Sequence, residues 1–290
     1  MYVITPESAR NLSPVFKGKL GRLLFRIGLK VTGIHHVNTT HHNVGEAGIP
    51  DGPEFAKGIL DDVQVDFRIG HAERLEQLPK GAFIAIANHV YGHLDGICLV
   101  DILGHQRPQT KVMVNEFLMW IKGLAPSFIA VNPNLGKGTA TSTSVSGIKT
   151  ALQQIRNGEP LALFPSGAVA DLKPRKGWIL EEREWQDAAI KLIRKARVPV
   201  IPIRFFDHNS WFYYGLGLLD YRIRFARLFH ELVNKRGTHP RLGIGETITV
   251  EQQDAISSDE ACKAFLRRSV DQMPEPEPES YTLRSELWKK

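Results

Sequence analysis

The chain has 290 residues, of which 42% are hydrophobic, and it carries a formal net charge of +6 at pH 7. This length and apolar content suffice for one large core, and the basic balance suits nucleic acid, anionic lipid or an acidic protein partner without choosing among them. Cys98 and Cys262 are the two cysteines and lie far apart in apolar surroundings, which excludes a disulfide framework or a cysteine zinc site and makes a reducing compartment the default.

The N-terminal residues 1–13 lack the apolar core of a secretory signal, and no apolar run reaches the roughly 18 residues that a transmembrane helix needs. Residues 16–31 are predicted to form an amphipathic helix, because apolar residues recur on one side at helical spacing. Five basic residues and no acidic one lie between Pro14 and Val31, which favours an interfacial membrane anchor over a helix packed on the core. The Gly, Asn and Pro of residues 35–53 predict a loop.

From residue 63 onward, strand patterns alternate with helical patterns. The alternation of apolar and polar residues predicts a first strand over residues 63–69. Further strands are expected at 83–87, 111–114, 127–131, 161–164 and 198–206, and helices at 96–103, 139–156 and 183–197. This order predicts an α/β fold with a mixed, largely parallel central sheet flanked by helices, preceded by the N-terminal amphipathic helix.

The last part of the chain continues with a late strand at 241–248 and a helix at 258–272, for which Ser258 is the candidate N-cap. Alternating Pro and Glu over 274–279 predict a stiff, acidic, extended spacer, which a small amphipathic tail follows. The predicted organisation is therefore a membrane-associated helix and loop over 1–60, an α/β domain over 61–273, and a spacer with its tail over 274–290.

The most informative stretch follows the apolar run at 83–87, where Asn88 and His89 lead into a Gly-containing loop that reaches Asp95. In open α/β sheets, ligands bind at the carboxyl ends of the strands. A His of near-neutral pKa is suited to remove a proton, and a carboxylate on its far nitrogen fixes the tautomer and stabilises the imidazolium. His89 and Asp95 are therefore a candidate general base and its partner, and the alternative is a His–Asp pair that serves the loop's structure alone.

Other chemistry is open to the same residues. His89, His93 and Asp95 together could be metal ligands of a metal-dependent hydrolase, with the double His at 35–36 and 41–42 as further candidates, although the spacing in a Gly-containing loop is unlike the usual zinc motifs. Ser166 lies in a Pro/Gly turn at a strand end but lacks the Gly-x-Ser-x-Gly elbow of serine hydrolases.

A possible anion site opens the helix that is expected from residue 139. Backbone N–H groups at a helix start can hold an anion. The sequence Gly136-Lys137-Gly138-Thr139 fails the phosphate-loop pattern, and so a nucleotide site is not expected there.

Four motifs in a fixed order resemble the glycerolipid acyltransferase family, and in particular its hemolysin-like members, which are related to lyso-ornithine-lipid and other amino-lipid O-acyltransferases. They are Asn88-His89 with Asp95 beyond a loop, Phe-Ile-x-Val-Asn-Pro at 128–133, Phe-Pro-x-Gly at 164–167, and Val-Pro-Val-Ile-Pro at 198–202. The resemblance covers roughly residues 81–248.

The resemblance implies that His89 is the general base and Asp95 its partner. The residues that it implies for substrate binding are Asn88, Gly92, Asn132, Phe164, Pro165, Ser166 and Gly167. The acyl donor would be a thioester of acyl carrier protein or coenzyme A, and no metal or other cofactor is implied, since a thioester is already activated. Backbone N–H groups near Ser166 or in the Asn88 loop would stabilise the oxyanion.

Three departures from the main family pattern concern the acceptor and the loop. Five residues separate His89 from Asp95, as they do in the hemolysin-like branch, whereas the main family has four. The loop must therefore bulge to bring the two side chains together. Ser166 stands where the main family has Glu, and Asn132 stands where it has an Arg that grips an acceptor phosphate. Losing that cation removes a charge-assisted contact, and so a lyso-lipid such as a 3-hydroxyacyl amino acid fits better than lysophosphatidate.

Partners and location follow from the basic segments. The aromatic run at 211–214 precedes six basic residues and suits an anionic headgroup layer, and either basic segment could also dock the acidic acyl carrier protein. No nucleic-acid-binding module is visible. We expect a bacterial O-acyltransferase that moves an acyl group to the hydroxyl of a lyso-amino-lipid or a lysophospholipid, and that is peripheral on the cytoplasmic face of the cell membrane. The alternatives are the metal-dependent hydrolase and a catalytically silent lipid- or protein-binding module.

Overall fold

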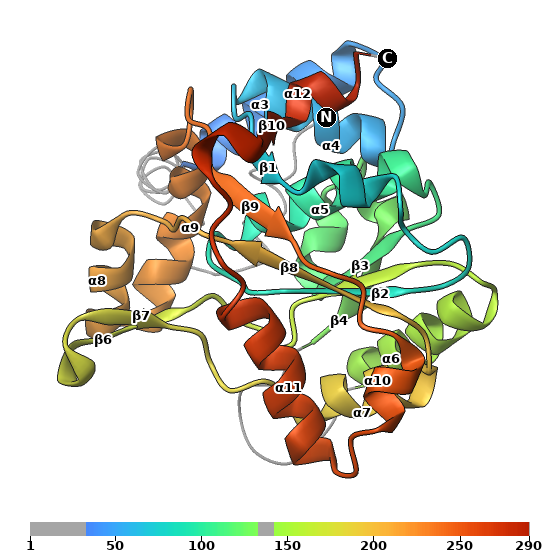
Figure 1. The fold of residues 1–290 in the computed structure, drawn as a ribbon. Helices are drawn as coiled ribbons and strands as arrows, with labels where there is room; N and C mark the ends of the chain where they lie inside the picture. The colour runs from blue at the N-terminus through green and yellow to red at the C-terminus, as the bar shows by residue number, and fades with distance from the viewer. Residues whose placement is uncertain (1–32, 133–141, 290) are drawn as a thin grey trace.

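The computed structural model describes residues 33–132 and 142–289, and the helix predicted at 16–31 lies outside them. A twisted eight-stranded sheet runs through the described part, with helices on both of its faces (Figure 1). Along the sheet the strands follow the order β10 (Tyr281–Leu283), β1 (Arg68–Gly70), β9 (Arg241–Ile244), β8 (Val200–Phe205), β2 (Ile84–Ala87), β5 (Leu161–Leu163), β3 (Lys111–Asn115) and β4 (Phe128–Val131).

The sheet is mixed and largely parallel, as the sequence predicts. All neighbouring strands from β8 to β4 are parallel, and so is the pair of β1 and β9. The antiparallel pairs are β8 with β9 and β1 with β10. Parallel strands end at the same edge of a sheet, which brings the loops that follow β2 and β5 together.

The two faces of the sheet are covered by different helices. Alternate residues of β2 point to opposite sides, so Ala85 and Ala87 join one apolar cluster while Ile84 and Ile86 join the other. The first cluster includes α4 (Pro53–Asp62) and α5 (His93–Gln106). The second cluster includes α6 (Ser142–Arg156), α7 (Asp187–Ala196) and α11 (Asp259–Asp271). Strands that are buried on both faces explain the continuous apolar runs that the sequence shows.

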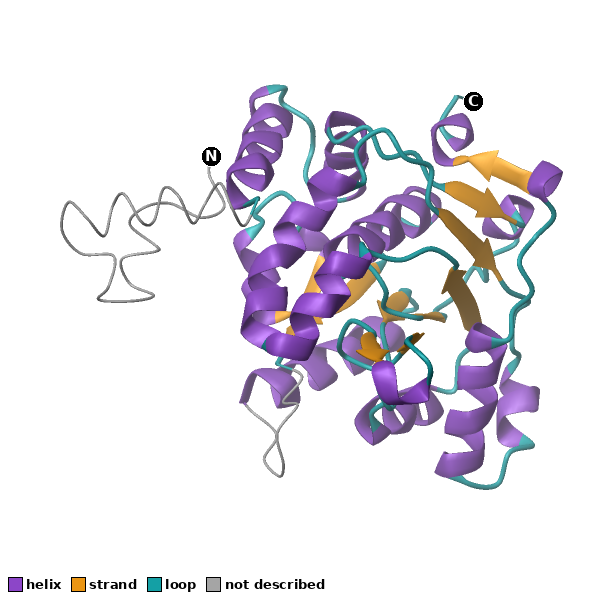
Figure 2. Ribbon diagram, turned by 90° about the vertical axis from the view of Figure 1, so that its left-hand side faces the viewer, coloured by secondary structure: helices purple, strands orange, loops and turns teal. Residues whose placement is uncertain are grey.

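A smaller layer lies beside the sheet. It consists of the hairpin of β6 (Asp171–Lys173) and β7 (Ile179–Glu181) with helices α8 (Trp211–Leu219) and α9 (Tyr221–Asn234). Figure 2 looks onto this side of the molecule. Buried residues of these elements form a third apolar cluster with Val169, which precedes β6, and the other members are Leu172, Tyr213, Tyr214 and Leu228.

The predicted elements of the central part are confirmed, with ends that shift by a few residues. The helix expected at 96–103 begins earlier, at His93, and the helix expected at 183–197 begins later, at Asp187. The strand expected at 63–69 covers only Arg68–Gly70. Ser258 caps α11, because its hydroxyl accepts a hydrogen bond from the Ala261 N–H at 3.1 Å.

The loop expected at 35–53 is wrong, because most of it is the helix α3 (Ile34–Glu46). The physical reason is tertiary packing, which overrides weak local preference. The His41 ring packs against Phe55 of α4 with centroids 5.1 Å apart, and Thr40 Oγ1 donates a hydrogen bond of 2.6 Å to Asp62.

The C-terminal tail adds an edge strand to the sheet. β10 pairs antiparallel with β1, and the short helix α12 (Arg284–Leu287) follows it. Arg284 is only 2% exposed and contacts Asp101 of α5. The remaining α-helix of the described part is α10 (Val250–Asp254), which precedes α11. Among the described residues, every helix is too short or too polar to cross a bilayer.

Candidate active site

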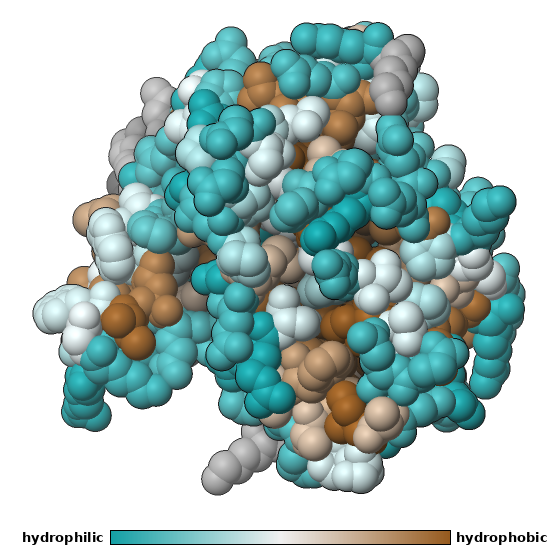
Figure 3. Space-filling view, in the orientation of Figure 1, coloured by the Kyte–Doolittle hydropathy of each residue, from teal (hydrophilic) through white to brown (hydrophobic). Residues whose placement is uncertain are grey.

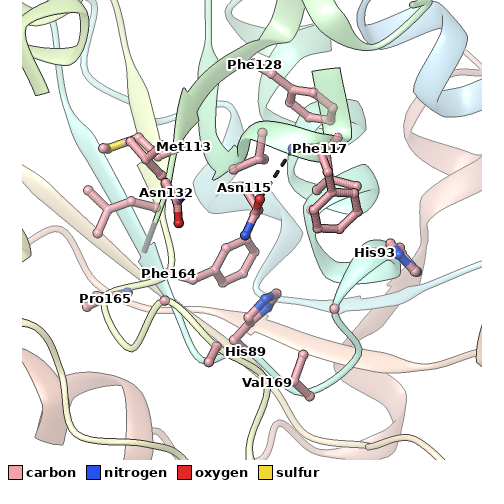
Figure 4. A pocket seen from close by; sticks show the side chains of 18 of the residues that line it. His89, His93, Met113, Asn115, Phe117, Phe128, Asn132, Phe164, Pro165 and Val169 are labelled. Carbon is pink, nitrogen blue, oxygen red and sulfur yellow. Dashed lines mark hydrogen bonds between the residues drawn. The ribbon is translucent and has the colours of Figure 1, made fainter. Parts of the chain in front are cut away.

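The site forms where the chain leaves β2 and β5 at the same edge of the sheet. These two strands pair in parallel, with Ile86 opposite Leu163. His89 follows β2, and the turn of residues 164–167 follows β5. Figure 4 shows the side chains of His89, Phe164 and Asn115 gathered at the centre of the cavity beside them.

Asn88 fixes the start of the His89 loop. Its side-chain amide donates a hydrogen bond of 2.9 Å to the Phe205 carbonyl and accepts one of 2.7 Å from the Phe205 N–H. These two bonds extend the pairing of β2 with β8 beyond the last strand residue. Asn88 is not among the residues that line the cavity, and so the structure places it as a support for the loop.

Asp95 organises the loop and begins the helix α5. Its carboxylate is fully buried and accepts backbone hydrogen bonds from Val90, Tyr91 and Gly92 at 3.1, 3.0 and 3.3 Å. The Gly96 N–H donates a further bond of 3.0 Å to the other carboxylate oxygen. The chain therefore wraps around the carboxylate, which is how five intervening residues still bring Asp95 to His89.

Gly92 is required at the turn into α5. Its φ of 86° lies in the left-handed region that favours glycine. A Cβ atom at this position would approach the Leu228 side chain of α9 to 2.9 Å. Gly92 also lines the cavity. The absence of a side chain therefore permits the left-handed backbone conformation and also leaves the cavity open at this position.

His89 and Asp95 form the pair that the sequence predicts. The His89 Nδ1 lies 2.9 Å from an Asp95 carboxylate oxygen, and the imidazole stacks on Phe164 with ring centroids 4.3 Å apart. Burial lowers the pKa of His89, but the charge and hydrogen bond of Asp95 and the charge of Glu182 outweigh it and raise the pKa above its ordinary value. The pair can therefore accept a proton and stabilise the imidazolium that results.

Glu182 is a site residue that the sequence does not reveal. One of its oxygens accepts hydrogen bonds of 2.9 Å from the His89 N–H and of 2.9 Å from the Ser166 hydroxyl. Its other oxygen accepts a bond of 2.8 Å from the Trp185 indole. Burial raises the pKa of Glu182, and these three bonds oppose that rise. In the sequence it stands within Glu-Glu-Arg-Glu at 181–184, which resembles a solvated charge run.

In the turn after β5, some residues line the cavity and one lies outside it. Phe164, Pro165 and Gly167 line the cavity. Ser166 is 1% exposed and is not among the lining residues, because its hydroxyl turns inward to Glu182. The structure therefore places Ser166 outside the cavity, where its bond to Glu182 connects the turn after β5 with the His89 loop.

The cavity itself is largely apolar and has a volume of about 610 Å³. Its polar wall includes His89, Asn115 and Asn132. The Asn132 side chain donates a hydrogen bond of 3.0 Å to Glu116. The apolar end extends between α5, β3 and β4, where it is lined by Ile97, Leu118, Ile121, Leu124 and Phe128. Such a space accommodates a hydrocarbon chain next to a proton acceptor.

His93 also lines the cavity but does not join the His89–Asp95 pair. Its ring stacks on Phe229 with centroids 4.6 Å apart, and burial lowers its pKa to about 4. Within residues 33–132 and 142–289, the structure contains no group of three or more His, Cys, Asp or Glu side chains that could hold a metal ion.

A buried carboxylate–imidazole pair at the carboxyl edge of a parallel sheet, beside an apolar cavity, defines a site that can deprotonate a hydroxyl next to a hydrocarbon chain. The chain belongs to the acyltransferase family, whose sequence model matches residues 9–273.

Two curated relatives are both named lyso-glycine lipid O-acyltransferase. The one from Bacteroides thetaiotaomicron is 29% identical over 167 residues, which are 57% of this chain and 57% of the relative. The one from Phocaeicola vulgatus is 25% identical over 226 residues, which are 76% of this chain and 77% of the relative. The match thus spans a little over half the length of the Bacteroides protein.

Proposed function

We propose that this protein is a lysolipid O-acyltransferase, which moves an acyl group from a thioester to the free hydroxyl of a lyso-lipid. The single observation that carries the proposal is the His89–Asp95 pair, 2.9 Å apart, at the wall of the apolar cavity. The names of the two relatives support the same activity.

In the proposed mechanism, His89 removes the proton of the acceptor hydroxyl as its oxygen attacks the thioester carbonyl. Asp95 holds the imidazole through Nδ1 and stabilises the imidazolium. When the tetrahedral intermediate collapses, the carbon–sulfur bond breaks, and the departing thiolate takes the proton from His89. The products are the acylated lipid and the free thiol of the carrier, so protons and electrons balance.

The oxyanion requires donors that are not already engaged. The N–H groups of Val90, Tyr91 and Gly92 donate to Asp95, and that of His89 donates to Glu182. These bonds disfavour the Asn88 loop as the oxyanion site. The remaining proposal is that backbone N–H groups near Ser166 stabilise the oxyanion. The candidates there are Ala168 and Val169, because the Gly167 N–H donates to the Phe164 carbonyl and the Ala170 N–H donates to the His89 carbonyl.

The proposed acceptor is a lyso-amino-lipid such as a lyso-glycine lipid. Among the described residues that line the cavity, Arg224 is the one with a permanent positive charge. Its guanidinium is already paired with Asp171 at 2.9 Å and donates to the Ala170 carbonyl at 3.0 Å. A phosphate monoester headgroup, which carries more negative charge than the single carboxylate of a lyso-glycine lipid, would therefore lack a cation to bind there. The amide and the hydroxyl of a lyso-glycine lipid suit the side chains of Asn115 and Asn132.

The donor and the location complete the proposal. An acyl thioester of acyl carrier protein or coenzyme A supplies the acyl group, and the chemistry requires no metal or other cofactor. The protein would act as a peripheral protein on an anionic membrane surface at the cytoplasmic face, where its acceptor resides.

The test is transfer from radiolabelled acyl carrier protein, and in parallel from acyl-coenzyme A, to a panel of lyso-lipids. We expect His89→Ala to lower the rate by roughly 10²–10⁴-fold. His36→Ala, whose imidazole is exposed on α3, is the matched control and should be as active as the wild type. The donor and acceptor that give the fastest transfer identify the substrates.

Three results would contradict parts of the proposal. Equal transfer by wild type and His89→Ala would exclude His89 as the base. Acylation of lysophosphatidate as fast as any lyso-amino-lipid would overturn the acceptor class. Vesicle binding without transfer would indicate a lipid-binding module. Hydrolysis that a chelator abolishes would indicate a metal-dependent hydrolase.

A further inference from the structure

Exposed apolar side chains gather on one side of the molecule. Nine of the eleven large hydrophobic residues that are exposed in the described part of the chain lie on β7, α8, α9 and the turns beside them. These nine residues, which we call the apolar face, are Trp178, Ile179, Trp211, Phe212, Leu218, Leu219, Tyr221, Ile223 and Phe225. In Figure 3, brown atoms at the left lie where Figure 1 places α8 and the β6–β7 hairpin.

The helix α8 is apolar on both of its sides. It has nine residues, from Trp211 to Leu219, none of them charged. Tyr213 and Tyr214 point inward to the third apolar cluster, while Phe212 and Leu219 are 61% and 77% exposed. A helix that is hydrophobic all round is normally buried in a core or in a membrane. At about 1.5 Å per residue, α8 is far too short to span a bilayer.

Basic side chains lie around the apolar face. The sequence of segments 171–183 and 211–227 contains seven basic and four acidic residues. Arg175 and Lys176 are exposed, whereas Arg224 is buried. The Arg227 guanidinium lies 5.4 Å from the centre of the Phe212 ring, and that of Arg183 lies 5.8 Å from the centre of the Tyr221 ring. Exposed Trp and Tyr beside a surplus of cations are typical of surfaces that contact anionic lipid headgroups.

The apolar face is continuous with the cavity. Tyr221 and Phe225 of α9 belong to the face and also line the cavity, together with Leu228 one turn further on. Phe225 contacts Phe117 edge-on, with ring centroids 5.3 Å apart. Side chains of α9 thus belong both to the exposed surface and to the wall of the cavity beside His89.

We propose that the apolar face rests on an anionic lipid bilayer, and that the α9 side of the cavity opens toward that bilayer. An amphiphilic acceptor then moves laterally from the bilayer to His89, keeping its hydrocarbon chain out of water. This lateral entry rests on the proposed transfer function, whereas the binding of the face to lipid does not. Burying this many aromatic and aliphatic side chains provides the affinity, and the surrounding cations select the anionic surface.

The test is cosedimentation of the full chain with vesicles of equal parts phosphatidylglycerol and phosphatidylcholine. The test variant combines Trp178→Ser, Phe212→Ser and Leu219→Ser, none of which lines the cavity. We expect vesicle partitioning to fall at least tenfold. Trp120→Ser removes a Trp that is 46% exposed outside the face, and should bind like the wild type. Because the substituted side chains are exposed, all variants should melt within a few degrees of the wild type.

A second arm examines charge. Arg175→Glu combined with Lys176→Glu should weaken binding to the phosphatidylglycerol vesicles and leave binding to pure phosphatidylcholine vesicles unchanged. Both residues are exposed in the turn between β6 and β7. Equal loss on both vesicle types would show that the cations do not select anionic lipid.

Several outcomes would overturn the docking proposal. The first is a wild type that binds no vesicles, and the second is a triple-serine variant that binds vesicles as well as the wild type does. The third is a wild type that is a dimer and a triple-serine variant that is a monomer with unchanged vesicle binding. Transfer to acceptor dispersed in detergent separates the two proposals. If the triple-serine variant keeps activity in detergent and loses transfer in vesicles, both the transfer function and the docking proposal are supported. If the wild type binds vesicles but transfers nothing, only the docking proposal is supported.

Discussion

At the scale of single residues, two carboxylates from different parts of the chain determine the behaviour of His89. Asp95 contacts the ring at Nδ1, and Glu182 holds the backbone N–H of the same residue. Both negative charges raise the pKa of His89 against the effect of burial. Glu182 does not touch the ring, and so it is a positioning residue whose charge also stabilises the imidazolium.

A pH profile tests the role of Glu182. A general base must be neutral before reaction, so kcat/KM should fall as pH drops through the pKa of His89, which lies above the ordinary 6.5. Glu182→Gln removes one negative charge, lowers this pKa, and should move the acid limb of the profile down by roughly half a pH unit. It should also lower kcat, because the support of His89 and Ser166 is weakened.

Glu184→Gln is the control for this prediction. Glu184 lies two residues away, is 73% exposed and pairs with Lys263 on the surface. Its profile should match that of the wild type. A Glu182→Gln variant with lower activity but an unshifted acid limb would assign Glu182 a purely structural role.

At the scale of elements, the site depends on how α5 begins. The first turn of this helix supplies Asp95, and the loop before it supplies the N–H groups of Val90, Tyr91 and Gly92 that hold the carboxylate. The loop can close only because Gly92 takes a left-handed conformation against Leu228 of α9. The start of the helix, the loop and the His89–Asp95 pair are therefore one unit, and a change in the backbone at Gly92 reaches His89.

Gly92→Ala tests this coupling. The new methyl group meets both the unfavourable φ and the Leu228 side chain, so we expect the free energy of unfolding to fall by about 1–3 kcal/mol. Transfer activity should fall more than stability alone explains. Denaturant unfolding and steady-state kinetics measure the two effects.

Gly215→Ala provides the comparison within a helix. A Cβ at Gly215 of α8 meets nothing within 4 Å, so this variant should be as stable as the wild type or more stable by about 0.5–1 kcal/mol. If Gly92→Ala behaved in the same way, the loop would not require the left-handed turn.

At the scale of the whole molecule, the C-terminal tail secures the helix that carries Asp95. Arg284 and Asp101 are both buried, and an Arg284 nitrogen lies 3.2 Å from an Asp101 oxygen. Arg284 also contacts Asp61 of α4. The pair joins residues that are 183 positions apart in the chain, and so α4, α5 and α12 are fixed to one another across the edge of the sheet.

Arg284→Met removes the guanidinium beside the buried Asp101 and leaves His105, whose Nδ1 lies 2.9 Å from the other carboxylate oxygen, as its remaining charged partner. We expect the free energy of unfolding to fall by about 3–5 kcal/mol. Adding Asp101→Asn to the same chain removes the buried negative charge and should restore part of that loss. Chemical denaturation of the wild type and the two variants measures both effects. An Arg284→Met variant as stable as the wild type would show that the tail contributes little to the stability of the fold.

Much of the sheet could be predicted from local sequence. The strands β2, β5 and β8 are continuous apolar runs, and the alternation with helices indicated a parallel arrangement. Helix α3 was missed, since its His and Asn residues have weak helical preference and are held by contacts with α4. The edge strand β10 was missed as well, because three residues carry too little periodicity to indicate a partner.

The sequence by itself determined the His89–Asp95 pair, the order of the motifs around it and the class of fold, because these depend on short-range spacing and on hydrophobic periodicity. Only the tertiary structure decided that Glu182 supports His89 from 93 positions away, that Ser166 turns inward, and that α8 and α9 present one exposed apolar face. The physical reason is that long-range contacts follow from how separate elements pack, and the residues that make them carry no local pattern that distinguishes them from solvated polar residues or core residues.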